Sequence, residues 1–125
     1  MLREYEVTII TRGEMPDTDR LKTLEKYEQI LLQDGGQLIN KADWGVKKMS
    51  HPIKRNYKGH YMNYDLTTLP NHVTEAERLM RIDDNVLRYL SINIGQDVDI
   101  KERKAEIAKQ AAYREKEMRK LDDRN

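Results

Sequence analysis

The stretch Lys41-Ala-Asp-Trp-Gly-Val-Lys-Lys-Met-Ser-His-Pro-Ile-Lys-Arg-Asn-Tyr-Lys-Gly-His60 decides the fold of this chain. It contains the facing ends of two predicted strands, about 37–49 and 57–67, which are separated only by a turn region at 50–56. Two successive strands with a short connection and no helix between them indicate a β-hairpin. A glycine inside a strand favours a bulge or bend, so we expect one at Gly45. Pro52 is expected to fix the turn.

Two further strands are predicted outside the hairpin, over residues 3–11 and 86–94. The first alternates between apolar and polar side chains, a period of two that is typical of a half-buried strand. In the first strand the apolar face consists of Tyr5, Val7 and Ile9. In the last strand one face is expected to carry Val86, Leu90, Ile92 and Ile94, and the other face Leu87 and Tyr89.

Two amphipathic helices are predicted between these strands. The first begins near Asp19, where Asp17 or Thr18 is expected to cap the free N–H groups of its first turn. It should end at 34–36, Asp-Gly-Gly, because glycine adopts the left-handed conformation of a helix C-terminus. Its apolar face is expected to comprise Leu21, Leu24, Tyr27 and Leu31. The second helix starts at Pro70 and should carry Val73, Ala76, Leu79 and Met80 inward.

The predicted order is therefore strand, helix, strand, strand, helix, strand. A split β-α-β unit used twice gives an α+β, ferredoxin-like domain with a four-stranded antiparallel sheet and both helices on one face. Right-handed crossovers place the first and third strands in the centre and leave the other face of the sheet open. We expect this domain over residues 1–95. Residues 96–125, rich in both charges, should form a charged C-terminal extension that is helical or disordered.

The composition excludes several classes of site. The chain has 125 residues and no cysteine, which excludes a disulfide scaffold, a cysteine-ligated zinc site and thiol catalysis. None of the three histidines has a partner at metal-ligand spacing, and no glycine-rich turn leads into a helix. No apolar run is long enough to span a membrane, and no signal-peptide pattern is present. We expect a soluble, intracellular protein that is not an enzyme and has no catalytic residue, metal, cofactor or small-molecule substrate.

The basic residues favour a different role. The opening stretch carries six basic residues and one acid, Asp43, whereas the whole chain has a net charge of only +1. Neighbouring cations can neutralise several phosphates together and release counterions. We therefore expect a hairpin arm that offers cations to a nucleic-acid backbone at a confined site. The candidates around the arm are Lys47, Lys48, Lys54, Arg55 and Lys58, with Arg3 on the first strand and Arg88 on the last.

Four motifs occur in this order: Arg3-Glu-Tyr5-Glu-Val7, Trp44-Gly45-Val-Lys47-Lys48-Met-Ser-His-Pro52-Ile53, Lys58-Gly59-His-Tyr61 and Arg81-Ile-Asp-Asp-Asn85-Val86-Leu-Arg88. Together, over residues 1–94, they resemble bacterial small-subunit ribosomal protein six. Members of that family show an R-x-Y-E strand, a G-x-R/K-x-L-A-Y-P-I segment, a G-x-Y/F motif and a later D-x-x-V-x-R strand. The chain departs from this pattern at His51, which stands where the family usually has an aromatic residue. The resemblance therefore assigns His51 no role.

The resemblance implies a ferredoxin-like structural protein of the small ribosomal subunit, cytoplasmic and without catalysis. It implies binding to the central domain of small-subunit rRNA on the platform, as a heterodimer with small-subunit ribosomal protein eighteen. The basic contacts that it implies, with Lys58 as an added candidate, are Arg3, Lys47, Lys48, Lys54, Arg55, Lys58, Arg81 and Arg88.

Two alternatives belong to other classes. The RNA-recognition motif shares the fold, and residues 58–61 with Tyr64 are faintly similar to its third strand, which stacks bases on exposed aromatics. Here the first aromatic position is His60, phenylalanine is absent, and the strand at 3–11 has no outward aromatic pair. Trp44 is expected to pack in the hairpin or to contact a protein rather than to stack on a base. A small ligand-binding or regulatory enzyme of this fold would need a polar pocket that the sequence does not display.

Overall fold

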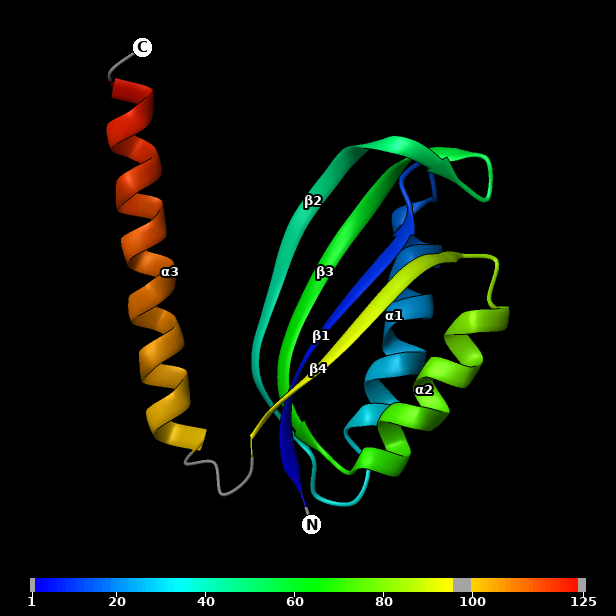
Figure 1. Ribbon diagram of the computed structural model, residues 1–125, viewed down its shortest axis with the longest axis horizontal. Coiled ribbons are helices and arrows are strands. Elements are labelled where there is room, and N and C mark those ends of the chain that lie inside the picture. Colours follow the sequence, from blue (N-terminus) through cyan, green and yellow to red (C-terminus); the bar gives the residue numbers. More distant parts are fainter. Residues whose placement is uncertain (1, 96–99, 124–125) are drawn as a thin grey trace.

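The computed structural model describes residues 2–95 and 100–123 (Figure 1). It confirms the predicted order of the first six elements and adds a third helix. The elements are β1 (Arg3–Arg12), α1 (Asp17–Leu31), β2 (Gln37–Ile53), β3 (Asn56–Thr68), α2 (Pro70–Ile82), β4 (Val86–Gly95) and α3 (Ile100–Asp123).

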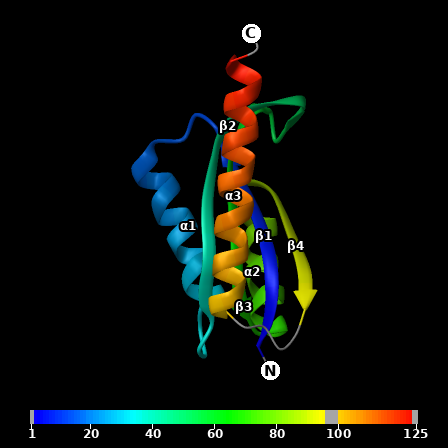
Figure 2. The same cartoon turned by 90° about the vertical axis from the view of Figure 1, so that its left-hand side faces the viewer.

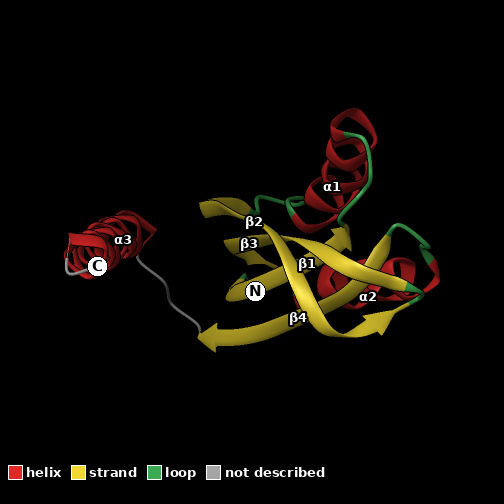
Figure 3. Cartoon of the chain, turned by 90° about the horizontal axis from the view of Figure 1, so that it is seen from above, coloured by secondary structure: helices red, strands yellow, loops and turns green. Residues whose placement is uncertain are grey.

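The four strands form one antiparallel sheet in the order β2-β3-β1-β4. β1 and β3 are central, as the crossover rule predicts. Both α1 and α2 pack on the same face of the sheet, which Figure 3 shows from above. The ferredoxin-like fold is therefore confirmed.

The core lies between the sheet and these two helices. The alternation predicted for β1 is correct, because Val7 and Ile9 are fully buried against this layer and Tyr5 is nearly so. Leu24 and Tyr27 of α1 pack on them. The remaining buried members of the cluster are Leu31, Met62, Tyr64, Leu66, Val73, Ala76, Met80 and Val86.

Helix α1 begins earlier than predicted, and one residue of its predicted apolar face is wrong. Pro16 occupies the N-cap position, and neither Asp17 nor Thr18 caps the helix, since no side chain bonds to its first N–H groups. Leu21 is 54% exposed, whereas Arg20 and Thr23 are buried. The prediction that Leu21 belongs to the apolar face was wrong, because a polar interaction turns Arg20 toward the sheet.

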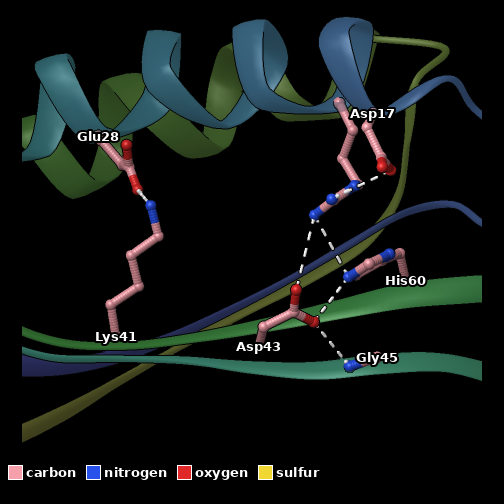
Figure 4. A network of polar contacts seen from close by, with 7 residues as sticks. Asp17, Glu28, Lys41, Asp43, Gly45 and His60 are labelled. Carbon is pink, nitrogen blue, oxygen red and sulfur yellow. Dashed lines mark hydrogen bonds and ion pairs between the residues drawn. The ribbon is translucent and has the colours of Figure 1, made fainter.

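This interaction is a network that joins α1 to β2 and β3 (Figure 4). The Arg20 guanidinium lies 3.3 Å from Asp17 and 3.8 Å from Asp43, and the Asp43 carboxylate lies 2.7 Å from His60 Nε2. Gly45 donates its N–H to the same carboxylate at 2.8 Å. Burial opposes ionisation of Asp43, but the bonds from Gly45 and His60 and the charge of Arg20 together lower its pKa.

The hairpin is longer and its turn tighter than predicted. β2 continues through Pro52 to Ile53, which pairs with Asn56, so only two residues, Lys54 and Arg55, form the turn. The turn assigned to 50–56 and the role given to Pro52 were therefore wrong. The bulge at Gly45 is confirmed, since φ is +79° there and the register with β3 shifts between Asp43 and Gly45.

The end of the hairpin curls over the sheet. The last pair between β1 and β3 joins Arg12 to Gly59, so residues 48–58, which we call the arm, project past β1. A second small cluster of Ile10, Met49 and Leu87 holds the arm down. Gly59 permits this close approach, because a Cβ there would lie 2.5 Å from Cγ2 of Ile10.

The faces of β4 differ from the prediction at its first two residues, since Leu87 packs with Ile10 under the arm while Tyr89 packs on the helix-side core. The register between β1 and β4 shifts between Ile10 and Thr11, where Thr11 pairs with Val86. This irregularity moves Val86 to the helix side, where it is fully buried. The exposed apolar residues of β4 on the opposite, open face of the sheet are Leu90, Ile92 and Ile94.

The charged extension is helical over the described residues 100–123, while 96–99 and 124–125 lie outside the described part. α3 lies on the open side of the sheet, in front of it in Figure 2, whereas α1 and α2 lie behind. Arg103 anchors it through two bonds of 2.9 and 3.0 Å to the Glu4 carboxylate on β1. Within the described residues, no helix is long and apolar enough to cross a membrane.

Candidate nucleic-acid interface

Six of the eight predicted cations gather at one end of the molecule. Lys47 and Lys48 lie at the base of the arm on β2, Lys58 lies opposite on β3, and all three are exposed. The two turn residues are exposed at the tip, and Arg88 lies on the neighbouring part of β4. The sequence motifs are far apart along the chain, and the sheet brings them together.

Lys48 and Lys58 form a pair of like charges within this group. They are direct cross-strand partners in the β2–β3 ladder. Like charges directly opposite on a sheet destabilise it by repulsion. An anion bound between them removes that repulsion, so the pair fits a phosphate contact better than a purely structural role.

The turn at the arm tip is strained. Lys54 and Arg55 both have positive φ, +48° and +68°. Two-residue hairpins with positive φ at both central positions strongly prefer Asn-Gly, since other residues crowd their Cβ against the backbone at a cost of roughly 1 kcal/mol each. Strain held at an exposed basic tip suggests that these side chains are kept for binding.

We predict that Arg55→Gly stabilises the protein but weakens RNA binding. Glycine adopts positive φ without a Cβ clash, so the free energy of unfolding should rise by about 0.5–1 kcal/mol in urea denaturation. Loss of the guanidinium should lower RNA affinity several-fold in a filter-binding titration. Arg55→Lys is the matched control and should change neither quantity much. A less stable Arg55→Gly variant, or one that binds RNA as the parent does, would contradict this interpretation.

Lys54 has a second partner besides any anion. Its Nζ donates to the backbone carbonyls of Asp83 and Val86, at 3.1 and 2.9 Å. The Asp83 side chain in turn accepts a 2.5 Å bond from the Tyr27 hydroxyl of α1. Lys54 therefore fastens the arm tip to the α2–β4 turn.

Arg3 and Arg81 do not join the group. Arg3 pairs with Thr68 at the opposite end of β1 from Arg12, a separation of roughly 30 Å at about 3.3 Å per residue. Arg81 is in the last turn of α2, on the helix side. A hydrogen bond with Tyr89 raises the pKa of the Arg81 guanidinium. Any contact of these two residues with RNA therefore involves other segments than those at the arm.

The sequence interpretation missed an aromatic groove beside the arm. Trp44, Tyr61 and Arg88 line a groove of about 480 Å³ on the open face. Lys47 Nζ lies 5.6 Å from the ring centroid of Trp44 and 5.4 Å from that of Tyr61. Alternation along β3 puts Tyr61 on the face opposite to the buried Met62, so this strand carried a signal of the groove. No pattern in the sequence placed Trp44 beside Tyr61.

A buried acidic cluster on the same face was also missed. Glu4 is 1% exposed and Asp65 is 9% exposed. Burial opposes ionisation of Glu4, but hydrogen bonds from Arg103 and Asp65 and the Arg103 charge lower its pKa. Burial, followed by the hydrogen bond to Glu4 and its charge, raises the pKa of Asp65 to about 7. The partner of Glu4 lies 99 positions along the chain, so no local pattern signals it.

Two of the three histidines, His60 and His72, form contacts that join elements of the fold. His60 lies in the α1 network, and His72 lies 2.8 Å from the Asp34 carboxylate, joining the start of α2 to the turn after α1. His51 is exposed on the arm. No group of three potential metal ligands occurs among residues 2–95 and 100–123.

The comparisons with known proteins agree on one family. The model of the family "Ribosomal protein S6" matches residues 4–93. The chain is 36% identical over 111 residues to small ribosomal subunit protein bS6 of Desulforapulum autotrophicum, covering 89% of this chain and 72% of that protein. It is 35% identical over 95 residues to bS6 of Ruegeria pomeroyi, covering 76% of this chain and 81% of that protein.

A solved structure supports the fold. The crystal structure of 30S ribosomal protein S6 from Thermotoga maritima superposes with a TM-score of 0.68. The alignment covers 85% of this chain and 99% of that chain, at 23% sequence identity.

Proposed function

The chain belongs to the ribosomal protein S6 family, and on that premise we propose that it binds the central domain of small-subunit rRNA jointly with small-subunit ribosomal protein eighteen. Members of this family are structural components of the small ribosomal subunit and not enzymes, so the protein belongs to the ribosome in the bacterial cytoplasm. The proposal concerns which molecules it contacts there, and with which residues.

The cation cluster at the arm carries the RNA half of the proposal. Its central observation is the facing pair Lys48 and Lys58, which repel each other unless an anion lies between them. Lys47 on β2, Arg55 at the arm tip and Arg88 on β4 are further exposed cations at the same end of the molecule. Phosphate contacts of this kind position a protein on RNA without reading its sequence. The full proposed set remains Arg3, Lys47, Lys48, Lys54, Arg55, Lys58, Arg81 and Arg88, with residues 1–95 as the binding domain and 96–125 as an extension.

The open face of the sheet supports the part of the proposal that concerns a protein partner. Leu90, Ile92 and Ile94 of β4 are 57%, 48% and 44% exposed and lie in one row. An apolar row of this kind fits a protein surface better than a phosphate backbone. The RNA-recognition-motif alternative fits less well, since β1 presents Glu6 and Thr8 to this face instead of stacking aromatics.

The decisive experiment compares the RNA affinity of this protein with and without protein eighteen. The isolated protein is expected to bind a central-domain rRNA fragment weakly in a filter-binding titration, and addition of protein eighteen should raise the affinity at least tenfold. The logarithm of the affinity of the complex should fall linearly with the logarithm of salt concentration. Equal affinity with and without protein eighteen would contradict joint binding. Tight, base-specific binding of a single strand at physiological salt, with an affinity that protein eighteen does not raise, would instead favour the RNA-recognition motif.

A further inference from the structure

We propose that the groove between the arm and the open face binds one unpaired RNA nucleotide, with its base against Trp44 and Tyr61 and its phosphate toward Lys47 and Arg88. This inference rests on the proposed RNA-binding function and adds a base contact to what are otherwise phosphate contacts. It also revises the expectation that Trp44 only packs the hairpin or meets a protein.

Trp44 of β2 points into the groove. Asp43 is held on the helix side by His60 and Arg20, as Figure 4 shows. The next side chain therefore points to the open face, where the groove places Trp44 with Tyr61. Trp44 remains 42% exposed instead of being covered by its neighbours. A large aromatic side chain held in place and left half open is a suitable stacking surface.

Cations stand beside these rings. The ammonium of Lys47 lies over both of them, at 5.6 and 5.4 Å from the ring centroids. Arg88 lines the same groove from β4 and is exposed. Aromatic rings with adjacent cations are the combination with which proteins hold single-stranded nucleic acid, because bases stack while phosphates are neutralised. A nucleotide carries a phosphate that can neutralise these cations, whereas an apolar protein segment does not. The cations therefore favour a nucleotide as the occupant of the groove.

The floor of the groove is polar. Glu6 and Thr8 of β1 line it, and the Asn63 amide donates to both, at 3.1 Å to Glu6 Oε1 and 3.0 Å to Thr8 Oγ1. A carboxylate has about four acceptor positions, so the single bond from Asn63 leaves capacity for a ligand. Carboxylates accept from exocyclic amino groups such as N4 of cytosine. The groove should therefore prefer cytosine to uracil, which presents a carbonyl at that position.

Fluorescence of Trp44 tests the inference directly, because it is the single tryptophan of the chain. Short oligocytidylate should quench its emission at low salt, and oligouridylate should bind several-fold more weakly. Tyr61→Leu should lower the affinity for oligocytidylate roughly tenfold through loss of stacking. Tyr57→Leu is the matched control, since Tyr57 is 61% exposed on the arm but does not line the groove. It should leave the affinity unchanged.

A second measurement separates this inference from the function on which it rests. The protein, a tryptophan-free form of protein eighteen and the rRNA fragment are mixed, and binding and Trp44 emission are recorded together. Full-affinity binding with unchanged emission overturns the nucleotide site but leaves the proposed function standing. Failure to bind overturns the proposed function. Quenching by protein eighteen alone, with none by oligocytidylate, makes the groove a protein-binding surface and overturns the inference. Equal binding of the two oligonucleotides overturns the contact with Glu6.

Discussion

Replacing Lys47 and Lys48 together with alanine is expected to lower the affinity for central-domain rRNA roughly 10- to 100-fold near physiological salt. The two side chains stand at the base of the arm and are exposed, and Lys48 directly faces Lys58. Each lysine that neutralises a phosphate releases about one counterion, so the slope of log affinity against log salt should flatten by about 2. Filter binding at several salt concentrations, with protein eighteen present, measures both quantities.

The fold should survive this double substitution. Alanine at position 48 removes the repulsion with Lys58, so the free energy of unfolding should be unchanged or slightly higher. Lys22→Ala with Lys26→Ala on α1 is the matched control, because it removes the same charge from exposed positions of the helix layer. That control should keep the salt slope of the parent. An unchanged slope in the arm variant would show that these lysines do not contact phosphate.

The second large effect is expected at Asp65, in the stability of the protein as a function of pH. Asp65 is 9% exposed, its Oδ1 has no hydrogen-bond partner, and the Glu4 carboxylate is its neighbour. Burial and Glu4 raise the pKa of Asp65 to about 7, whereas an aspartate in an unfolded chain titrates near 3.9. The folded state therefore holds a proton that the unfolded state releases.

The sign of the pH dependence follows from this difference. The contribution of Asp65 to stability is fully present below about pH 4 and is lost as the pH rises to about 7. Asp65→Asn keeps the side chain neutral at every pH and can still donate to Glu4. It should raise the free energy of unfolding at pH 8 by on the order of 1–3 kcal/mol, with little change at pH 4. Urea denaturation from pH 4 to pH 8 measures the effect.

Asp84→Asn provides the control for this experiment, since the same chemical change is made on an exposed carboxylate. Its stability curve should run parallel to that of the parent. The Asp65→Asn curve should diverge from the parent between pH 4 and pH 7. Parallel curves for both variants would mean that Asp65 is ionised in the folded protein at neutral pH. Arg103 of α3 would then have to balance the negative charges of both Glu4 and Asp65.

Local patterns predicted the elements and their order. Alternation identified β1, helical periodicity placed Leu24, Tyr27 and Leu31 in the core, and the helix-free connection identified the hairpin. These signals are reliable because the period of a strand or helix depends only on the residues within it. The four ordered motifs were likewise enough to identify the family that the comparisons then showed.

Local patterns failed where distant residues interact. Leu21 has the correct spacing for the core but is exposed, because Asp43 and His60 draw Arg20 inward. Val86 and Leu90 have the same parity but lie on opposite faces, because the register with β1 shifts between them. A pairing irregularity reverses the faces of all residues on one side of it. Neither helical periodicity nor strand alternation, which depend on one element alone, can predict such effects of a second element.

The sequence alone determined an α+β fold, a basic hairpin and the S6 family, since these depend on periodicity, composition and motif order. Only the tertiary structure decided how the charges are distributed. Sheet pairing brought Arg88 to the arm, left Arg3 at the far end of β1 and set Trp44 beside Tyr61. Side-chain contacts tied Lys54 to backbone carbonyls and joined Arg103 of α3 to the buried Glu4. The physical reason is that contacts across a sheet depend on register and bulges, which involve two strands at once.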